Sequence, residues 1–399
     1  MPRSILLVLL AAIAQEKKQD PPPAPAVDEV KVDAAIKKGI AYLRTAPSPS
    51  SHAGIKDSDE LILWTYVHAG VPQSDPDYQK LWQKMLADPL EKTYTVALQA
   101  MILEEVDRVK HQERIAQCAQ FLVDNQAANG QWSYGNPTEF AKDVKVPEVT
   151  KSGTSTERAG AREFGAPEEK KKPKVVQHVA VKKMKDGPAA GDNSNTQYAA
   201  LGLRACFDSG IMIPEQTILL AVKWWREAQF AGPAKDSDKD GKPDVVSGVS
   251  GKIEGWNYKD QATQADKAPY SAMTAGGTSA LVIYDYMLGR KWKDDSYVKA
   301  GMNWLAYHFS VNTNLYYMYG LERTGILYGT EKIGSHDWYG EGAKLILKNQ
   351  NADGSWGKPP AAKPDDKGKL THDTCFAILF LRRATRPLVA TEAGGKLKK

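Results

Sequence analysis

The sequence has few cysteines and little net charge. The first argues against a disulfide-stabilised protein and the second against a nucleic-acid-binding protein. Its 399 residues include only Cys118, Cys206 and Cys375, too few for a disulfide framework. All three lie in apolar helical contexts, so we expect buried thiols. The net charge is +5, and residues 138–190, with 12 basic and 8 acidic side chains, supply most of that excess. The rest of the chain is close to neutral and shows no sign of the basic face of a nucleic-acid-binding protein.

The sequence also lacks an apolar run long enough for a permanent membrane span. The run that begins at Ile5 lasts ten residues, whereas a bilayer needs about 20. Together with Arg3 and the small residues before Gln15, this makes residues 1–14 typical of a secretory signal peptide. A buried N-terminal helix is the alternative. The charged, proline-rich residues 15–31 then form a linker, and we expect an exported protein, periplasmic or extracellular.

Apolar residues make up 42% of the chain, enough for a large core, and they recur at helical spacing in paired segments. In each pair the first segment is amphipathic. The second is apolar nearly all round, so it must be buried on every side. The pairs are 32–46 with 59–70, 75–88 with 92–106, 111–126 with 193–210, 214–229 with 270–289, 294–309 with 314–329, and 335–350 with 371–385.

This alternation of amphipathic and buried helices predicts an all-α double ring. Six amphipathic helices outside six buried ones close into an (α/α)6 toroid over residues 32–385. An open helical solenoid is the alternative, but its terminal repeats should carry polar faces. The last segment, 371–385, is as apolar as its central counterparts, and we therefore favour a closed toroid.

Two insertions and a tail depart from the helical pattern. Residues 137–191 contain only two aromatic residues and a KKKPK run, which predicts a long, mostly disordered insertion. Within it, the stretch 175–181 has the composition of a short strand. Residues 232–254, rich in Gly, Asp and Lys, form a second insertion, and residues 386–399 form a basic tail.

Two junctions share the seven-residue motif Q-x-x-x-G-x-W. The Gln stands at the end of an outer helix, where carbonyls need donors. The Gly takes the left-handed conformation that ends the helix, and the Trp folds back as an apolar plug. A broken third copy starts at Gln229, with Gly255-Trp256 displaced by the second insertion. The two complete copies consist of Gln126, Gly130, Trp132, Gln350, Gly354 and Trp356.

This motif resembles the QW repeat of the squalene–hopene cyclase and protein prenyltransferase superfamily. The resemblance covers residues 32–385 and implies an (α/α)6 toroid. It also implies a structural role for the six motif residues, so it specifies the scaffold rather than the chemistry.

The catalytic motifs of that superfamily are degraded in this chain. Its cyclases protonate an alkene with a D-x-D-D-T-A acid, but Leu370–Cys375 and Asp192–Gln197, the nearest matches, lack the paired acids. His372 is too weak an acid for this step. The prenyltransferases hold zinc with Asp-x-Cys and a later His. Asp373 and Cys375 have that spacing, but no His follows. We expect no zinc and keep Asp373 as the candidate acid.

An aspartate-rich loop in the second insertion resembles the start of a calcium-binding loop. Aspartates occupy positions 1, 3, 5 and 9, and a glycine occupies position 6. Ser247 replaces the bidentate acid expected at position 12, so a solvated acidic turn is the alternative. The candidate ligands of a structural calcium ion are Asp236, Asp238, Asp240 and Asp244.

A polar patch near the C-terminus supplies two further catalytic candidates. Glu322 lies in a buried-looking helix, where it needs a partner such as Arg323 or another cation. His336 followed by Asp337 is a candidate base with its orienting acid. Because adjacent residues rarely face one another, a structural polar network is the favoured alternative.

Residues of the buried helices are expected to surround one mouth of a central cavity. Most are aromatic and a few are polar, a composition that suits an isoprenoid-like apolar ligand or a sugar chain. These residues are Trp64, Tyr94, Asn195, Tyr198, Tyr270, Tyr317, Arg323 and His372.

Three function classes remain open, and the degraded active sites favour the first. It is a non-catalytic toroid that binds an apolar, isoprenoid-like ligand or a protein partner in its central cavity. The second is a terpenoid cyclase-like or transferase-like enzyme with Asp373 as a reassigned acid. The third is a secreted polysaccharide lyase or hydrolase, because such enzymes also use (α/α)6 toroids. Its candidate cluster is Glu322, Arg323, His336 and Tyr339.

Overall fold

The computed structural model shows a mainly helical protein. It describes residues 27–46, 59–158, 171–234, 236–237, 239–240, 242–260, 262–263, 267–358 and 368–388. These residues form twelve α-helices, one 3-10 helix and eight short strands. The expected signal peptide, most of the linker and most of the basic tail lie outside the described residues.

One α-helix lies at each of the twelve segments that the sequence predicts. The odd-numbered helices are α1 (Glu29–Thr45), α3 (Pro76–Ala87), α5 (Gln112–Asp124), α7 (Glu215–Glu227), α9 (Ser296–Tyr307) and α11 (Trp338–Lys348). The even-numbered helices are α2 (Asp59–Ala69), α4 (Thr93–Asp107), α6 (Asn193–Asp208), α8 (Ser271–Met287), α10 (Leu315–Tyr328) and α12 (Gly368–Leu381).

The first and last helices begin three residues earlier than expected. Helix α1 starts at Glu29, inside the expected linker, because the side chain of Asp28 accepts a hydrogen bond from the Lys31 amide (3.2 Å) and caps the helix. Helix α12 starts at Gly368 rather than at residue 371. Polar first turns carry no apolar periodicity, so the sequence pattern does not detect them.

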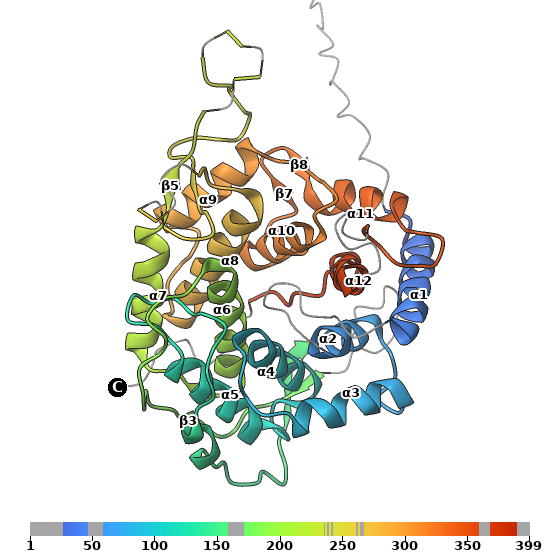
Figure 1. Ribbon diagram of the computed structural model, residues 1–399, viewed down its shortest axis with the longest axis vertical. Helices are drawn as coiled ribbons and strands as arrows, with labels where there is room; N and C mark the ends of the chain where they lie inside the picture. The colour runs from blue at the N-terminus through green and yellow to red at the C-terminus, as the bar shows by residue number, and fades with distance from the viewer. Residues whose placement is uncertain are drawn as a thin grey trace, which may run out of the picture.

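The even-numbered helices are buried and the odd-numbered helices lie around them. Fifteen of the 17 residues of α8 are buried, against two of the 12 in α3. Figure 1 shows the even-numbered helices toward the middle and the odd-numbered helices at the periphery. Each even-numbered helix contacts the next one along the chain, and α12 contacts α2. The contacts between even-numbered helices therefore run from α2 through to α12 and from α12 back to α2.

The described part of the insertion 137–191 contains short helical and strand segments, and the disorder expected there stays a prediction. It includes the 3-10 helix η1 (Glu139–Asp143) and strand β1 (Thr154–Arg158), which pairs antiparallel with β2 (Lys171–Pro173). Lys172 is only 3% exposed and lies 2.7 Å from Glu104 in α4. A lysine-rich composition suggests solvation, but here one of the lysines is a buried ion-pair partner.

The remaining strands are two residues long and join neighbouring loops. Strand β3 (Val179–Ala180), within the stretch 175–181, pairs parallel with β4 (Ile211–Met212). Strands β5 (Phe230–Ala231) and β6 (Glu254–Gly255) pair antiparallel at the base of the second insertion. Strands β7 (Lys332–Ile333) and β8 (His336–Asp337) form a hairpin before α11.

The second Gln–Trp motif connects the last odd-numbered helix to the first. Gln350 Nε2 donates to the carbonyl of Ala35 in α1 (2.8 Å). The indole N–H of Trp356 donates to the carbonyl of Ile346 in α11 (2.8 Å), and its backbone N–H donates to Thr374 Oγ1 in α12 (3.0 Å). One motif thereby ties together α11, α12 and α1.

The first motif makes the equivalent hydrogen bonds. Gln126 Nε2 donates to the carbonyl of Thr217 in α7 (2.8 Å). The Trp132 indole donates to the carbonyl of Leu122 (2.7 Å), and its backbone N–H donates to Thr196 Oγ1 in α6 (3.1 Å). Helices α5, α6 and α7 are joined in the same way as α11, α12 and α1.

The interrupted third copy also keeps this geometry. Gln229 Nε2 donates to the carbonyl of Tyr297 in α9 (2.9 Å). The Trp256 indole donates to the carbonyl of Trp225 (2.7 Å), and its backbone N–H donates to Thr274 Oγ1 (3.2 Å). The second insertion therefore lengthens this junction without breaking it.

The glycine of each complete motif is required by its backbone conformation. Gly130 has φ +94° and Gly354 has φ +90°, both in the left-handed region. A Cβ atom would collide with the carbonyl of Leu220 at Gly130 and with that of Lys38 at Gly354. Both glycines thus allow the chain to pass close to the next odd-numbered helix.

Glu60 gives the fold a pH-dependent stability. Its side chain is buried in α2, where Gln99 Nε2 donates to Oε1 (3.2 Å) and burial raises its pKa to about 7. A carboxyl group with a raised folded pKa contributes stability below its unfolded pKa and loses that contribution as the pH rises through the folded pKa.

We expect Glu60→Gln to raise the free energy of unfolding by about 1–3 kcal/mol at pH 8 and to change it little at pH 4. The amide keeps the acceptor for Gln99 and removes the charge. Urea unfolding of variant and wild type at both pH values measures the difference. An equal change at the two pH values would contradict this account of Glu60.

Candidate functional site

Side chains from α6 and α10 meet among the even-numbered helices. Gln197 Nε2 donates to the Tyr316 hydroxyl (2.7 Å), and Gln197 Oε1 accepts from Arg323 Nη2 (2.9 Å). The Arg323 guanidinium carbon lies 4.6 Å from the ring centroid of Tyr319 and 5.2 Å from that of Tyr198. We call these five residues the arginine–tyrosine cluster.

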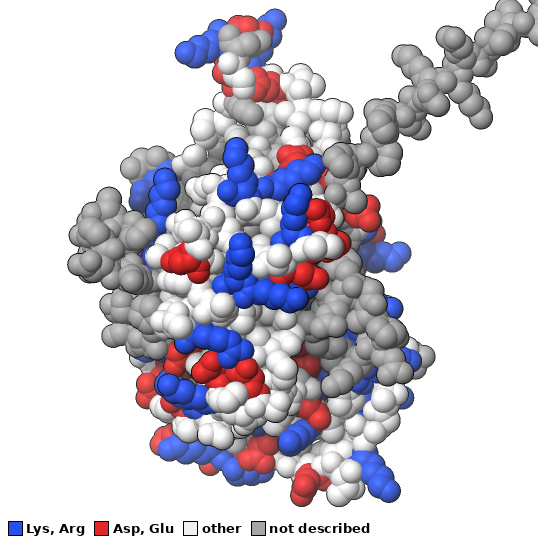
Figure 2. All heavy atoms as spheres, turned by 90° about the vertical axis from the view of Figure 1, so that its right-hand side faces the viewer, with Lys and Arg blue, Asp and Glu red and all other residues white. Residues whose placement is uncertain are grey.

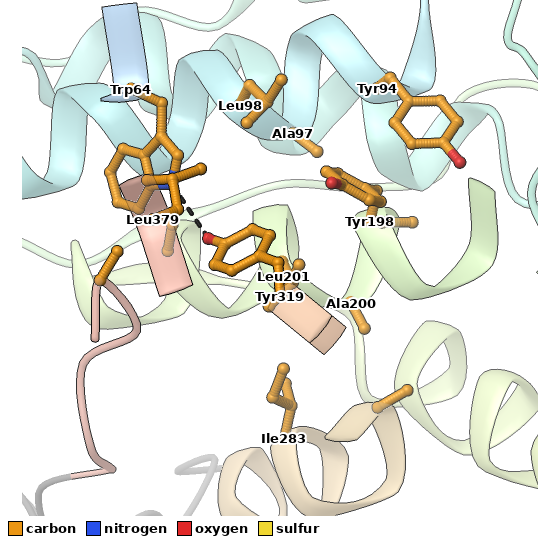
Figure 3. Close-up of a cluster of buried hydrophobic side chains, with 14 of the residues drawn as sticks. Trp64, Tyr94, Ala97, Leu98, Tyr198, Ala200, Leu201, Ile283, Tyr319 and Leu379 are labelled. Atoms are coloured by element: carbon orange, nitrogen blue, oxygen red, sulfur yellow. Dashed lines mark hydrogen bonds between the residues drawn. The ribbon is translucent and has the colours of Figure 1, made fainter. Parts of the chain in front are cut away.

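Helices α2 and α4 add aromatic rings to this cluster. Trp64 Nε1 donates to the Tyr319 hydroxyl (3.1 Å), a hydrogen bond that is dashed in Figure 3. The centroid of the Tyr94 ring lies 4.4 Å from that of Tyr198. The Phe376 ring of α12 stacks 5.9 Å from Tyr319. Side chains of five even-numbered helices therefore occupy the space between those helices.

Arg323 is the unusual charge in the arginine–tyrosine cluster. It is 1% exposed, and no carboxylate of the described residues lies within ion-pair distance of it. The amide oxygen of Gln197 and the π faces of two tyrosines stabilise the buried cation instead. A buried cation of this kind fixes the surrounding rings in place, since moving any of them would remove part of its compensation.

Three tyrosines near the start of α6 reach the surface, and we call them the outer tyrosines. Tyr134 is 43% exposed and Tyr270 39%, while Tyr258 is half-buried. Ser194 Oγ donates to Asp192 (2.5 Å) and lies 3.1 Å from the Tyr258 hydroxyl. Burial raises the pKa of Tyr270 to about 12, and the charge of Asp192 adds to this shift. This surface combines aromatic faces with a hydrogen-bonded carboxylate.

The chain after α12 packs against the C-terminal parts of α4, α6 and α10. The backbone N–H and hydroxyl of Thr385 donate to Glu322 (3.0 and 2.7 Å). Arg386 forms an ion pair with Glu105 (2.7 Å), and Arg204 donates to the Arg386 carbonyl (2.9 Å). Figure 1 shows this red segment leaving α12 and crossing the middle of the molecule. The first residue of the expected basic tail is thus part of the packed structure.

A small cavity lies beside this C-terminal segment. Its volume is about 40 Å³, and its lining includes Trp64, Met101, Leu201 and Arg386. That volume suits about one water molecule, and it is far smaller than the 300–1,000 Å³ typical of ligand pockets.

The structure does not bring the three catalytic candidates together. Glu322 binds Thr385, whereas Asp373 forms an ion pair with Lys369, and burial raises the Asp373 pKa against the effect of that lysine. His336 Nδ1 lies 3.1 Å from Glu341 Oε1 in the β8–α11 region. No hydrogen bond or ion pair recorded among the described residues joins Glu322, Asp373 or His336 to another of the three.

The cavity candidates divide into three groups. Trp64, Tyr94, Tyr198 and Arg323 meet in or beside the arginine–tyrosine cluster. Asn195 lies next to it, where its Nδ2 donates to Asp192 (2.9 Å), and Tyr270 is an outer tyrosine. Tyr317 is buried in the first turn of α10, where its backbone N–H donates to Asn314 Oδ1 (3.2 Å), and His372 is buried in the first turns of α12.

The sequence analysis did not place Gln197, Tyr316 or Tyr319 among the cavity residues. In α10, residues 316, 319 and 323 are spaced i, i+3 and i+7 and so share one helix face. That spacing, counted back from Arg323, selects Tyr316 rather than its neighbour Tyr317. Because the helix is apolar on all sides, hydropathy alone does not show which of its faces points toward the other buried helices.

Among the described residues, no group of three or more His, Cys, Asp or Glu side chains is arranged to hold a metal ion. In the aspartate-rich loop, Asp236 accepts from the Asp240 amide (3.1 Å) and Asp244 accepts from the Ser237 amide (2.9 Å). Asp238, the fourth candidate calcium ligand, lies outside the described residues. The calcium prediction therefore stays a prediction.

Two other expectations concern partners: no permanent membrane span and no basic face for nucleic acid. No helix in the described ranges is long and apolar enough to cross a bilayer. On the face shown in Figure 2, basic and acidic side chains are intermixed. That face therefore carries no extended patch of one sign.

Comparison with known proteins does not assign the chain to a family. No protein-family model matches it, and no similar sequence is found among curated proteins.

Proposed function

We propose that this chain is a non-catalytic (α/α)6 toroid of the squalene-cyclase and prenyltransferase repeat type, which binds an apolar ligand or a partner at one mouth. Two contacts support closure into a toroid. Helix α12 contacts α2, and Gln350 of the α11 motif donates to Ala35 in α1. In an open solenoid these first and last repeats would lie far apart.

The two ends of the toroid differ in this proposal. The C-terminal segment occupies the end where Glu105 and Glu322 lie, and the cavity beside it holds about 40 Å³. The outer tyrosines lie near the start of α6, beside Asp192 and Ser194. A ligand would therefore bind from the tyrosine end, above the arginine–tyrosine cluster.

The single observation that carries the non-catalytic assignment is the separation of the candidate catalytic groups. Alkene protonation needs a strong, unpaired acid, but Asp373 forms an ion pair with Lys369. Glycoside hydrolysis needs two opposed carboxyl groups, but Glu322 is 0% exposed and bound to Thr385. Binding needs neither arrangement.

The aromatic character of this end favours an isoprenoid-like ligand, whose alkenes pack well on tyrosine rings. The carboxylate of Asp192 supports a second candidate, a sugar chain, because it lies with Ser194 and Tyr258 beside exposed rings. The signal-peptide prediction for residues 1–14 adds the proposal that the protein acts outside the cytoplasm.

Titration with geranylgeraniol and, separately, with soluble oligosaccharides tests this proposal. We expect saturable geranylgeraniol binding, and the double variant Tyr134→Ala, Tyr270→Ala should weaken it at least tenfold. The control is Tyr328→Ala, a half-buried tyrosine at the C-terminal end of α10, which should bind as the wild type does. Oligosaccharide binding with the same variant pattern would favour the second candidate. Turnover of either ligand, or an equal loss in the control, would contradict the proposal.

A further inference from the structure

A second cavity, of about 680 Å³, lies on the outside of the helices. The loop between α3 and α4, helix α5 and the first part of the insertion 137–191 line it. None of its lining residues belongs to the arginine–tyrosine cluster or to the outer tyrosines. Its volume falls within the range of ligand pockets.

Arg114 of α5 is the key charge in this cavity. Its Nη2 donates to the carbonyl of Asp88 (2.6 Å) and to Gln99 Oε1 (3.0 Å). Its Nε is buried and has no hydrogen-bond partner, and no described carboxylate pairs with it within 4 Å. Gln99 links Arg114 indirectly to Glu60. The guanidinium therefore lacks a carboxylate partner among the described residues, although Arg114 as a whole is half-buried and lines the cavity.

The rest of the lining combines apolar walls with a basic rim. Leu90 and Phe140, with the neighbouring prolines, supply apolar surface. Lys142, Lys145 and Lys185 add three positive charges, of which Lys145 also forms an ion pair with Glu113 (3.1 Å). Two acidic side chains line the cavity against its four basic ones. Apolar walls beside a guanidinium and a lysine rim suit an extended chain that carries carboxylates.

We propose that this cavity binds an acidic peptide segment of a protein partner, with one carboxylate on Arg114 and others facing the three lysines. The site is distinct from the ligand-binding end of the toroid and does not depend on that function. It would make the protein a two-site adaptor, with a small molecule at the tyrosine end and a partner chain on the outer surface.

Fluorescence anisotropy with the full-length protein and a labelled six-residue glutamate peptide tests this inference. We expect Lys142→Glu, Lys145→Glu, Lys185→Glu to weaken binding at least tenfold. A control triple, Lys80→Glu, Lys299→Glu, Lys348→Glu, makes the same charge change at exposed lysines on α3, α9 and α11. It should weaken binding less than threefold.

A second variant tests whether peptide binding needs the planar guanidinium of Arg114 or only its positive charge. Arg114→Lys keeps the charge but not the planar fork, and we expect it to lose binding while its thermal unfolding stays close to that of the wild type. Equal losses in the two lysine triples would overturn the proposal. So would equal binding of a glutamine peptide, or competition by inorganic phosphate at the concentration at which the peptide itself competes.

Discussion

Replacing Trp356 with alanine should lower the free energy of unfolding by about 3–5 kcal/mol. The side chain is 1% exposed, and its indole N–H donates to Ile346 while its backbone donates to Thr374. It also packs against Gly39, where a Cβ atom would lie 2.8 Å from the indole ring. The substitution therefore opens a cavity where α11, α12 and α1 meet, the junction that closes the proposed toroid.

Denaturant unfolding followed by circular dichroism measures this loss. Trp292→Ala is a matched control, because that tryptophan is half-buried and its indole donates only a 3.3 Å hydrogen bond to Tyr328. We expect the control to lose less than about half as much stability. Equal losses for the two tryptophans would show that the motif has no special role in the fold.

Replacing Lys172 with methionine should cost about 3–5 kcal/mol, since it leaves the buried Glu104 without its nearest cation and removes a cation from Glu105, which keeps Arg386. Lys172 Nζ lies 2.7 Å from Glu104 and 2.9 Å from Glu105. Burial alone would raise the Glu105 pKa, but Lys172 and Arg386 outweigh it and hold that pKa below its usual value. Losing the lysine removes much of that effect and weakens the contact between the insertion and α4.

The pH dependence of this loss identifies its cause. In Lys172→Met the Glu105 pKa rises, so the destabilisation should be larger at pH 8 than at pH 4, where protonation removes the buried charge. Adding Glu105→Gln should recover part of the stability at pH 8. Lys171→Met, at the exposed neighbouring position, is the control. A loss independent of pH, or one shared by the control, would contradict the ion-pair explanation.

The helical framework was predictable because apolar periodicity is a local property. Every expected segment holds one helix, and the Gln–Trp spacing marked the junctions where Gln126 and Gln350 bind the next odd-numbered helix. The contacts of Lys172 in the insertion 137–191 were not predictable, because they join residues far apart in the chain. Glu104 lies 68 residues from Lys172, and composition cannot show that a lysine will meet two glutamates.

The centre of the candidate site was only partly predictable for a related reason. Glu322 was expected to need a partner such as Arg323, but adjacent helix residues point in different directions. Glu322 binds Thr385, whereas Arg323 turns toward Gln197 and two tyrosines. The direction of each side chain depends on how α10 is rotated about its axis relative to the neighbouring helices. A helix that is apolar all round does not reveal that rotation in its sequence.

The most direct test of the central claim, a non-catalytic toroid that binds a ligand, is the content of the protein purified from its native host. Mass spectrometry of an organic extract, with metal analysis of the same sample, measures it. We expect an isoprenoid-like molecule at up to one per chain, and its loss in the double variant Tyr134→Ala, Tyr270→Ala. Zinc at one per chain would contradict the claim by restoring a transferase-like site. An extract with no bound molecule would contradict the proposal that the protein binds an apolar ligand.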